Sequence, residues 1–293
     1  MDVLLRLVGV LLLAGAASLA QPPVSDAQPA PARPARIISL VPAVTEMLFA
    51  IGAGPQVAAV SSFDKFPPAI ERLPRVGALL DPDTERILSL RPNLVVIYGS
   101  QAELQEQFKR AGISTFVYRH GGLADTLDTI GAVGRATGHP DGAAKVVTAL
   151  RARLEDIRRR VADKARPRTL LVISREPGTL RGLYASGGVG FLHDVLELAG
   201  GTNVFADLRE EGVQPSQETL ITRRPDVVVE LHPEVEAPDL AEARRAWSAL
   251  AATPAVRSNR VHVLAGAYLA IAGPRLGDAA ETIASALHPE AFK

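Results

Sequence analysis

The 293-residue chain contains no cysteine. Disulfide bonds, thiolate metal sites, a cysteine nucleophile and the lipidated cysteine of a bacterial lipoprotein are therefore excluded. The chain also carries no net charge, because 32 lysines and arginines balance 32 aspartates and glutamates. It lacks the broad basic field that attracts nucleic acid or an anionic membrane surface, so we expect neither as a partner.

Motifs for common enzyme chemistry are missing as well. The sequence has no phosphate-binding loop, nucleophile elbow or zinc-binding HExxH motif. The glycine-rich turn Gly187-Gly188-Val189-Gly190 lacks the spacing of a dinucleotide site and predicts a loop that enters a helix. The six histidines are scattered, which gives no support for a metal site. No catalytic residue is assigned; a cleft hydrolase and a module that binds only protein remain remote alternatives.

The first 20 residues predict a cleavable signal peptide. An apolar run, Leu7–Leu13, is followed by Ser18-Leu19-Ala20, which matches a small-x-small cleavage site. The run is shorter than the roughly 20 residues that span a bilayer. Residues 21–35 are rich in proline and alanine and predict an extended linker. We expect cleavage after Ala20 and a protein in the periplasm that is not inserted in the membrane.

The next part of the chain alternates between strand and helix patterns. This alternation predicts an N-terminal α/β lobe over residues 36–140, with a mostly parallel sheet covered by helices. The expected strands cover residues 37–40, 57–61, 94–98 and 115–118, and the expected helices cover 45–51, 84–90, 101–111 and 124–137.

A single long helix is expected to connect this lobe to a second one. From 141 to 164 apolar residues recur every three or four positions and charged residues occupy the outer face, so residues 141–165 predict an amphipathic connecting helix. The fold class is thus α/β, with two Rossmann-like lobes joined by one backbone helix. The second lobe, residues 166–293, should have strands at 169–173, 227–231 and 261–264 and helices near 189–199, 217–223, 239–252 and 276–287.

An internal repeat relates the two lobes. The segment Glu85–Val96 returns without a gap 133 residues later as Glu218–Val229, with the same helix, Arg-Pro turn and strand. Two related lobes leave a cleft between them, which is a preferred place for a ligand.

The repeat places Glu85 and Glu218 at equivalent positions in the first turn of a helix. Either glutamate could simply complement the helix dipole, at about 0.3–1 kcal/mol. Together they could instead present one acidic knob per lobe to a partner with two-fold symmetry. The residues alone leave both interpretations open.

Ligand contacts are expected just beyond the carboxyl ends of the strands, as in other open α/β sheets. Several rings and few charges follow the expected strand ends, which suits a large, flat, partly apolar ligand. The candidate ligand-binding residues are Phe63, Phe66, Tyr98, Arg119, Arg175, Tyr184 and Tyr268.

Several motifs together resemble a known family. They are Arg36–Glu46, Val60–Pro68, Glu85–Val95, Glu218 and Gly273-Pro274-Arg275, together with the long helix. The combination resembles the helical-backbone periplasmic binding proteins, which serve ABC importers of cobalamin, haem and iron siderophores. The resemblance implies a receptor without a resident cofactor, whose ligand is a corrinoid or a similar metal chelate. We expect a monomer that delivers this small molecule to a permease dimer.

The resemblance also assigns roles to individual residues. The transporter-docking glutamates of the family fall on Glu85 and Glu218, which favours docking over a purely local role. In cobalamin-binding members the cleft aromatics fall on Phe63, Tyr98 and near Tyr184, whereas two tryptophans fall on Leu79 and near Gly212. Two alternatives stay open: a siderophore held by Arg119, Arg175 or Arg181, and a haem ligated by Tyr98, Tyr184 or His120.

Overall fold

A computed structural model describes residues 33–234 and 239–293. The predicted signal peptide, and the predicted linker up to residue 32, lie outside the described residues. Within the described part of the chain, no helix is both long enough and apolar enough to cross a membrane.

The first lobe is built on a four-stranded parallel sheet. Its strand order is β2-β1-β3-β4. The strands are β1 (Ile37–Ser39), β2 (Val57–Val60), β3 (Leu94–Tyr98) and β4 (Ser114–Tyr118), and the helices are α1 (Pro42–Ala50), α2 (Thr84–Ser89), α3 (Ala102–Arg110) and α4 (Leu123–Thr137), with 3₁₀ turns η1 (Gly54–Gln56) and η2 (Pro68–Arg72). The central strands are mostly apolar because both faces are covered: Val96 enters one core, whereas its neighbours Val95 and Ile97 enter the other.

The second lobe is built on a mixed sheet. Its order is β10-β9-β5-β6-β8, with β7 paired to β5; β5, β9 and β10 run parallel, and β6 is antiparallel to β5 and to β8. The strands are β5 (Arg168–Ser174), β6 (Tyr184–Ser186), β7 (Thr202–Asn203), β8 (Gly212–Val213), β9 (Val227–His232) and β10 (Val261–Ala265). The helices are α6 (Phe191–Leu198), α7 (Gln217–Arg223), α8 (Leu240–Trp247), α9 (Pro254–Arg257) and α10 (Leu276–Leu287), with 3₁₀ turns η3 (Ser248–Leu250), η4 (Ala267–Ala270) and η5 (Pro289–Ala291).

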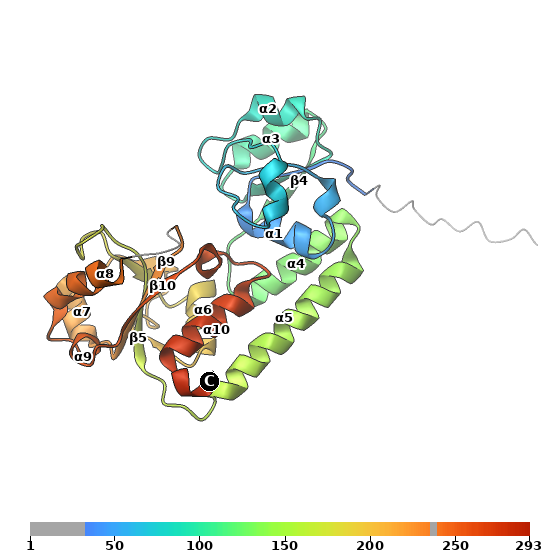
Figure 1. The fold of residues 1–293 in the computed structure, drawn as a ribbon. Helices are drawn as coiled ribbons and strands as arrows, with labels where there is room; N and C mark the ends of the chain where they lie inside the picture. Colours follow the sequence, from blue (N-terminus) through green and yellow to red (C-terminus); the bar gives the residue numbers. More distant parts are fainter. Residues whose placement is uncertain (1–32, 235–238) are drawn as a thin grey trace, which may run out of the picture. The chain divides into compact units, whose positions relative to one another are not determined.

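The connecting helix α5 (Pro140–Val161) packs against α4 and α10 (Figure 1). Its buried face carries Leu150, Leu154 and Ile157, and its arginine-rich opposite face is exposed, as predicted. The buried face belongs to one apolar core that also takes residues from α1, α4, α6 and α10. Because this core is continuous from one lobe to the other, large opening of the cleft would expose packed apolar surface and is opposed.

Some elements differ from the sequence-based expectation. The helix predicted over 239–252 ends at Trp247 and continues as a 3₁₀ turn, where the Ser248 hydroxyl bonds back to the Arg245 carbonyl at 2.7 Å. The connecting helix ends at Val161, earlier than predicted. The strands β6, β7 and β8 were not predicted, because two or three residues are too few to show a period.

The repeat folds into the same local structure in both lobes. Arg91 and Arg224, each directly before a proline, both have φ of +49°. The residue after each proline accepts a hydrogen bond from the backbone at the start of the first strand of its lobe. Asn93 Oδ1 accepts from Arg36 N at 3.1 Å, and Asp226 Oδ2 accepts from Arg168 N at 3.1 Å. The repeated segment therefore supplies each lobe with the same two features, an arginine in the left-handed backbone conformation and a side-chain hydrogen bond to the first strand.

Candidate ligand-binding site

A cavity of about 200 Å³ lies between the two lobes. The first lobe contributes the start of α1 and the loop after β2, and the second lobe contributes the end of β9 and the segment from η4 to α10. The lining residues are Pro42, Glu46, Phe63, Asp64, Lys65, Phe66, Pro233, Glu234, Ala267, Ala270, Ile271 and Arg275.

The loop after β2 is held so that its two rings face outward. Asp64 turns inward, where its Oδ2 accepts from the Ser61 backbone N–H at 2.7 Å, and Arg75 Nη1 donates to the Ser61 and Asp64 carbonyls at 3.0 and 2.9 Å. Phe63 and Phe66 are left 69% and 38% exposed. Exposed rings beside a cavity mark a surface that a ligand can cover.

An ion pair across the cavity links the lobes. Arg275 Nε donates to Glu46 Oε2 at 2.9 Å and Arg275 Nη2 donates to Glu46 Oε1 at 2.6 Å, with the Glu46 side chain only 4% exposed. The Arg275 guanidinium also lies 4.1 Å from the centre of the Phe66 ring and 5.8 Å from that of Tyr268. Glu46 thus fixes a cation against aromatic faces at the cavity wall.

A second ion pair crosses the cavity at its solvent side. Lys65 Nζ lies 2.8 Å from Glu234 Oε2, and the two side chains are 54% and 77% exposed. Exposed pairs of this kind contribute about 0–1 kcal/mol, so this contact can open at small cost.

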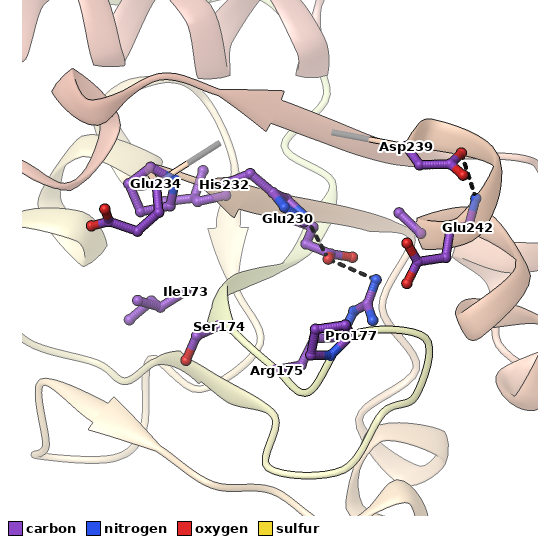
Figure 2. A pocket seen from close by; sticks show the side chains of 12 residues that line it. Ile173, Ser174, Arg175, Pro177, Glu230, His232, Glu234, Asp239 and Glu242 are labelled. Atoms are coloured by element: carbon purple, nitrogen blue, oxygen red, sulfur yellow. Dashed lines mark hydrogen bonds and ion pairs between the residues drawn. The ribbon is translucent and has the colours of Figure 1, made fainter. Parts of the chain in front are cut away.

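A larger cavity of about 340 Å³ adjoins the first and shares Pro233 and Glu234 with it. It lies at the carboxyl ends of β5 and β9, beside α8 (Figure 2). Pockets for drug-sized ligands usually measure about 300–1,000 Å³. The adjoining cavity alone lies at the lower end of this range, so a ligand larger than it would need both cavities, with the Lys65–Glu234 contact open.

The adjoining cavity has a buried charged wall. Glu230, 1% exposed, receives Arg175 Nη2 at 2.9 Å and Trp247 Nε1 at 2.6 Å, and its Oε1 lies 2.8 Å from His232 Nε2. Arg175 Nη1 donates to the Glu176 and Thr179 carbonyls. Figure 2 shows the guanidinium directed at Glu230. This arginine is therefore engaged inside the lobe.

The sequence profile described as "Periplasmic binding protein" matches residues 37–268. The chain belongs to the periplasmic binding protein family. The family resemblance and the two-lobed α/β fold with a backbone helix, both predicted from the sequence, are confirmed.

Known relatives include proteins that bind vitamin B12 and proteins that bind heme. The chain is 31% identical over 196 residues to the vitamin B12-binding protein of Yersinia pestis, covering 66% of this chain and 68% of that one. The crystal structure of the periplasmic vitamin B12 binding protein BtuF of Vibrio cholerae matches with a TM-score of 0.75 and 27% identity, covering 89% and 99%. The periplasmic heme-binding protein RhuT from Roseiflexus sp. RS-1 matches with a TM-score of 0.72 and 26% identity, covering 87% and 98%.

The structure brings some of the candidate ligand-binding residues of this binding protein together and separates others. Phe63 and Phe66 line the inter-lobe cavity and Arg175 lines the adjoining one. Tyr268 lies beside Arg275, and its hydroxyl is 3.1 Å from Thr282 Oγ1. Arg119 lines a separate open groove along β4 and α4.

Tyr184 lines neither of these two cavities. A Cβ atom placed on Gly212 would collide with the Tyr184 ring, so the ring closes over the glycine. The resemblance led us to expect a tryptophan of cobalamin-binding members near Gly212; Tyr184 occupies the space that a side chain at Gly212 would need.

Tyr98 begins a line of rings that runs from one lobe to the other. Its ring meets Tyr118 edge to face at 5.9 Å, Tyr118 meets His120 at 5.3 Å, and His120 stacks on Phe191 of α6 at 6.4 Å. Burial, with a contribution from the charge of Asp64, raises the pKa of Tyr98, and burial raises the pKa of Tyr118 to about 12. Both phenols therefore stay neutral at physiological pH.

Arg275 and Glu46 were missed as site residues. Both stand in motifs that carry the family resemblance, but they are 229 residues apart in the chain. The available signal was the arginine of Gly273-Pro274-Arg275 directly before a helix; the nearby Asp278 pairs with Arg153 instead.

Glu85 and Glu218 are both exposed in the first turns of α2 and α7. Other residues supply the caps: Asp83 Oδ1 accepts from Arg86 N at 2.9 Å, and Ser216 Oγ accepts from Thr219 N at 3.1 Å. Among the described residues, neither glutamate forms an ion pair. Both carboxylates are thus available to a partner.

Asp64 gives the binding protein an expected pH dependence. Burial raises its pKa from 3.8 to about 7, although the Ser61 N–H and Arg75 oppose the shift. Folding therefore takes up a proton between these values, so the free energy of unfolding should fall by up to about 4 kcal/mol as the pH rises from 4 to 7. Asp64→Asn should flatten this slope in urea denaturation at several pH values. An unchanged slope, matching that of the exposed control Asp81→Asn, would contradict the assignment.

Proposed function

We propose that this protein captures cobalamin or a related corrinoid between its lobes in the periplasm and delivers it to an ABC importer. The observation that supports this proposal most directly is the wall of the inter-lobe cavity formed by Phe63, Phe66 and Arg275. It offers aromatic rings and a stacked cation to a flat, partly apolar ligand. The 31% identity to vitamin B12-binding proteins supports the choice of ligand class.

Haem is the second candidate, because a heme-binding protein matches with nearly full coverage. A tyrosine that ligates iron does so as a phenolate. The raised pKa of Tyr98 opposes that ionisation, since burial and the nearby Asp64 both disfavour a second negative charge. A bound ferric iron would itself lower the pKa of a phenol, so the preference for a corrinoid rests on the 31% identity to vitamin B12-binding proteins.

The proposed role is binding without catalysis. A general base requires a carboxylate that is free to accept a proton from the substrate. Of the glutamates that line the two cavities, the buried Glu46 and Glu230 each hold an arginine at 2.6–2.9 Å. Their engagement supports a rigid binding wall, and incubation with the bound ligand should leave that ligand chemically unchanged.

Absorbance titration separates the two ligands. The purified protein is mixed with cyanocobalamin and, separately, with haemin, and bound ligand is measured after equilibrium dialysis. Saturable 1:1 binding of cyanocobalamin supports the proposal, whereas binding of haemin alone replaces it with the second candidate. Binding of neither would contradict both.

Phe63 and Phe66 are expected to contribute directly to affinity. Changing both to Ala removes the exposed rings while the buried Asp64 keeps the loop in place, so the Kd for cyanocobalamin should rise about 10- to 100-fold. Calorimetry measures the Kd, and thermal unfolding checks the fold. Leu80→Ala, which removes a 93% exposed side chain outside the cavities, is the control. Equal affinity in the folded double variant would show that the ligand lies elsewhere.

Delivery is proposed to use Glu85 and Glu218. Each carboxylate stands exposed on an equivalent helix of one lobe, and each can accept charge-assisted hydrogen bonds from an arginine on a permease subunit. We also propose that the protein is exported with a signal peptide that is cleaved after Ala20, and that it acts as a monomer. Mass spectrometry of the exported protein should find a mature chain beginning at Gln21.

A further inference from the structure

Two exposed aliphatic side chains occupy the same position in the repeat. Few large apolar residues are exposed in the described part of the chain: Phe63, Phe66, Leu79, Leu80, Leu88, Ile221 and Leu240. Leu88 and Ile221 lie 133 residues apart, which is the offset of the repeat, and they are 41% and 45% exposed. The two halves of the molecule thus expose an aliphatic group at matching places.

Packing inside each lobe does not require these groups. Directly before them, Ile87 and Leu220 are buried at 0% and 1% exposure and anchor α2 and α7 to their lobes. An outward position one residue later is normally polar on a helix that faces water. Leu88 and Ile221 are therefore accessible to a partner outside the chain.

Each aliphatic group stands beside one of the proposed docking glutamates. Glu85 and Leu88, and likewise Glu218 and Ile221, are three residues apart on a helix, so the two side chains of each pair share a face one turn apart. Each lobe offers an exposed carboxylate followed by an exposed aliphatic group. We name these pairs the two docking knobs.

We infer that each docking knob fits a paired feature of the permease, a cationic side chain next to an apolar recess. This inference rests on the proposed docking function and adds the aliphatic contact to it. Two knobs related by the internal repeat match a partner whose two identical subunits present the same surface twice. The carboxylate governs encounter, whereas the buried aliphatic group slows dissociation.

In-cell photo-crosslinking identifies what touches the knobs. The photoreactive residue p-benzoylphenylalanine is placed at position 88, 221 or 240 in the bacterium that makes the protein. It is also placed at Arg86 or Gln217, which lie next to the docking glutamates and report on docking itself. Positions 88 and 221 should both link to the same polytopic permease, and position 240 on α8 should not.

The outcomes separate the inference from the docking proposal. Links from 86 and 217 without links from 88 and 221 overturn the aliphatic contact and leave docking intact. No permease link from any position contradicts docking itself. Links from 88 and 221 to a second copy of this chain overturn the permease as the occupant.

Binding to that permease in nanodiscs then tests the energetics. Leu88→Ser combined with Ile221→Ser should weaken association at least about 10-fold, mainly through faster dissociation, with the slope of affinity against salt unchanged. Leu240→Ser should bind like the unaltered protein, and a circular dichroism melt checks the fold of each variant. Equal loss in the control, or none in the double variant, would overturn the inference.

Discussion

Replacing Glu85 and Glu218 together with alanine should abolish ligand uptake while the Kd for the ligand stays the same. Charge-assisted hydrogen bonds contribute about 1.5–3 kcal/mol each, so losing two should weaken permease association about 100-fold or more. The fold should tolerate the change, because Asp83 and Ser216 keep the caps of α2 and α7. Each substitution then removes only the favourable interaction of the carboxylate with the helix dipole, about 0.3–1 kcal/mol.

Uptake of radiolabelled cyanocobalamin by cells that carry only the variant measures the effect. The matched control is Glu103→Ala with Glu290→Ala, which removes two exposed glutamates from the first turns of other helical segments. The control should transport normally. A variant that loses ligand binding but still associates with the permease would show that Glu85 and Glu218 belong to the ligand site.

Ionic strength provides an independent readout of the same pair. The contacts lie at an exposed surface, where charges are screened over about 8–10 Å at 0.1–0.15 M salt. Association of the unaltered protein should weaken as salt rises, and the double alanine variant should show a flatter dependence. Equal slopes would argue against carboxylates at the docking contact.

The fold was largely predictable because strong local patterns and the global arrangement agree. Strands covered on both faces, such as β3 and the first three residues of β9, are continuous apolar runs, and the repeat marks one unit in each lobe. The two-residue strands β7 and β8 carry no such pattern. They pair because the longer strand β5 and the hairpin strand β6 offer them edges.

The candidate site was predictable only where it follows from position along the chain. Phe63 and Phe66 could be placed because they follow β2, and ligand sites lie beyond strand ends. The contact of Arg275 with Glu46 could not, since no local rule joins residues 229 positions apart. Arg175 shows the converse: it follows β5 as expected, but the neighbouring strand β9 supplies a buried carboxylate that engages it.

Breaking the ion pair between Arg175 and Glu230 should have the largest expected effect on stability. Glu230→Ala would leave the Arg175 guanidinium, whose side chain is 5% exposed, buried without its counter-ion and would remove the acceptor of Trp247 Nε1. Breaking a buried pair from one side costs about 3–5 kcal/mol. For a protein of this size the midpoint of thermal unfolding should fall on the order of 10 °C.

Replacing both partners distinguishes a structural pair from a ligand-binding arginine. Glu230→Leu combined with Arg175→Met removes both charges, so much of the lost stability should return, as it does when a buried ion pair gives way to apolar residues of similar volume. Calorimetric unfolding gives the stabilities, and cyanocobalamin titration of the same samples gives the affinities. If Arg175 acts by fixing the cavity wall, the rescued double variant keeps a Kd within about 10-fold of the original. If it contacts the ligand, stability recovers and affinity does not, because a ligand group that paired with the guanidinium would lose its partner.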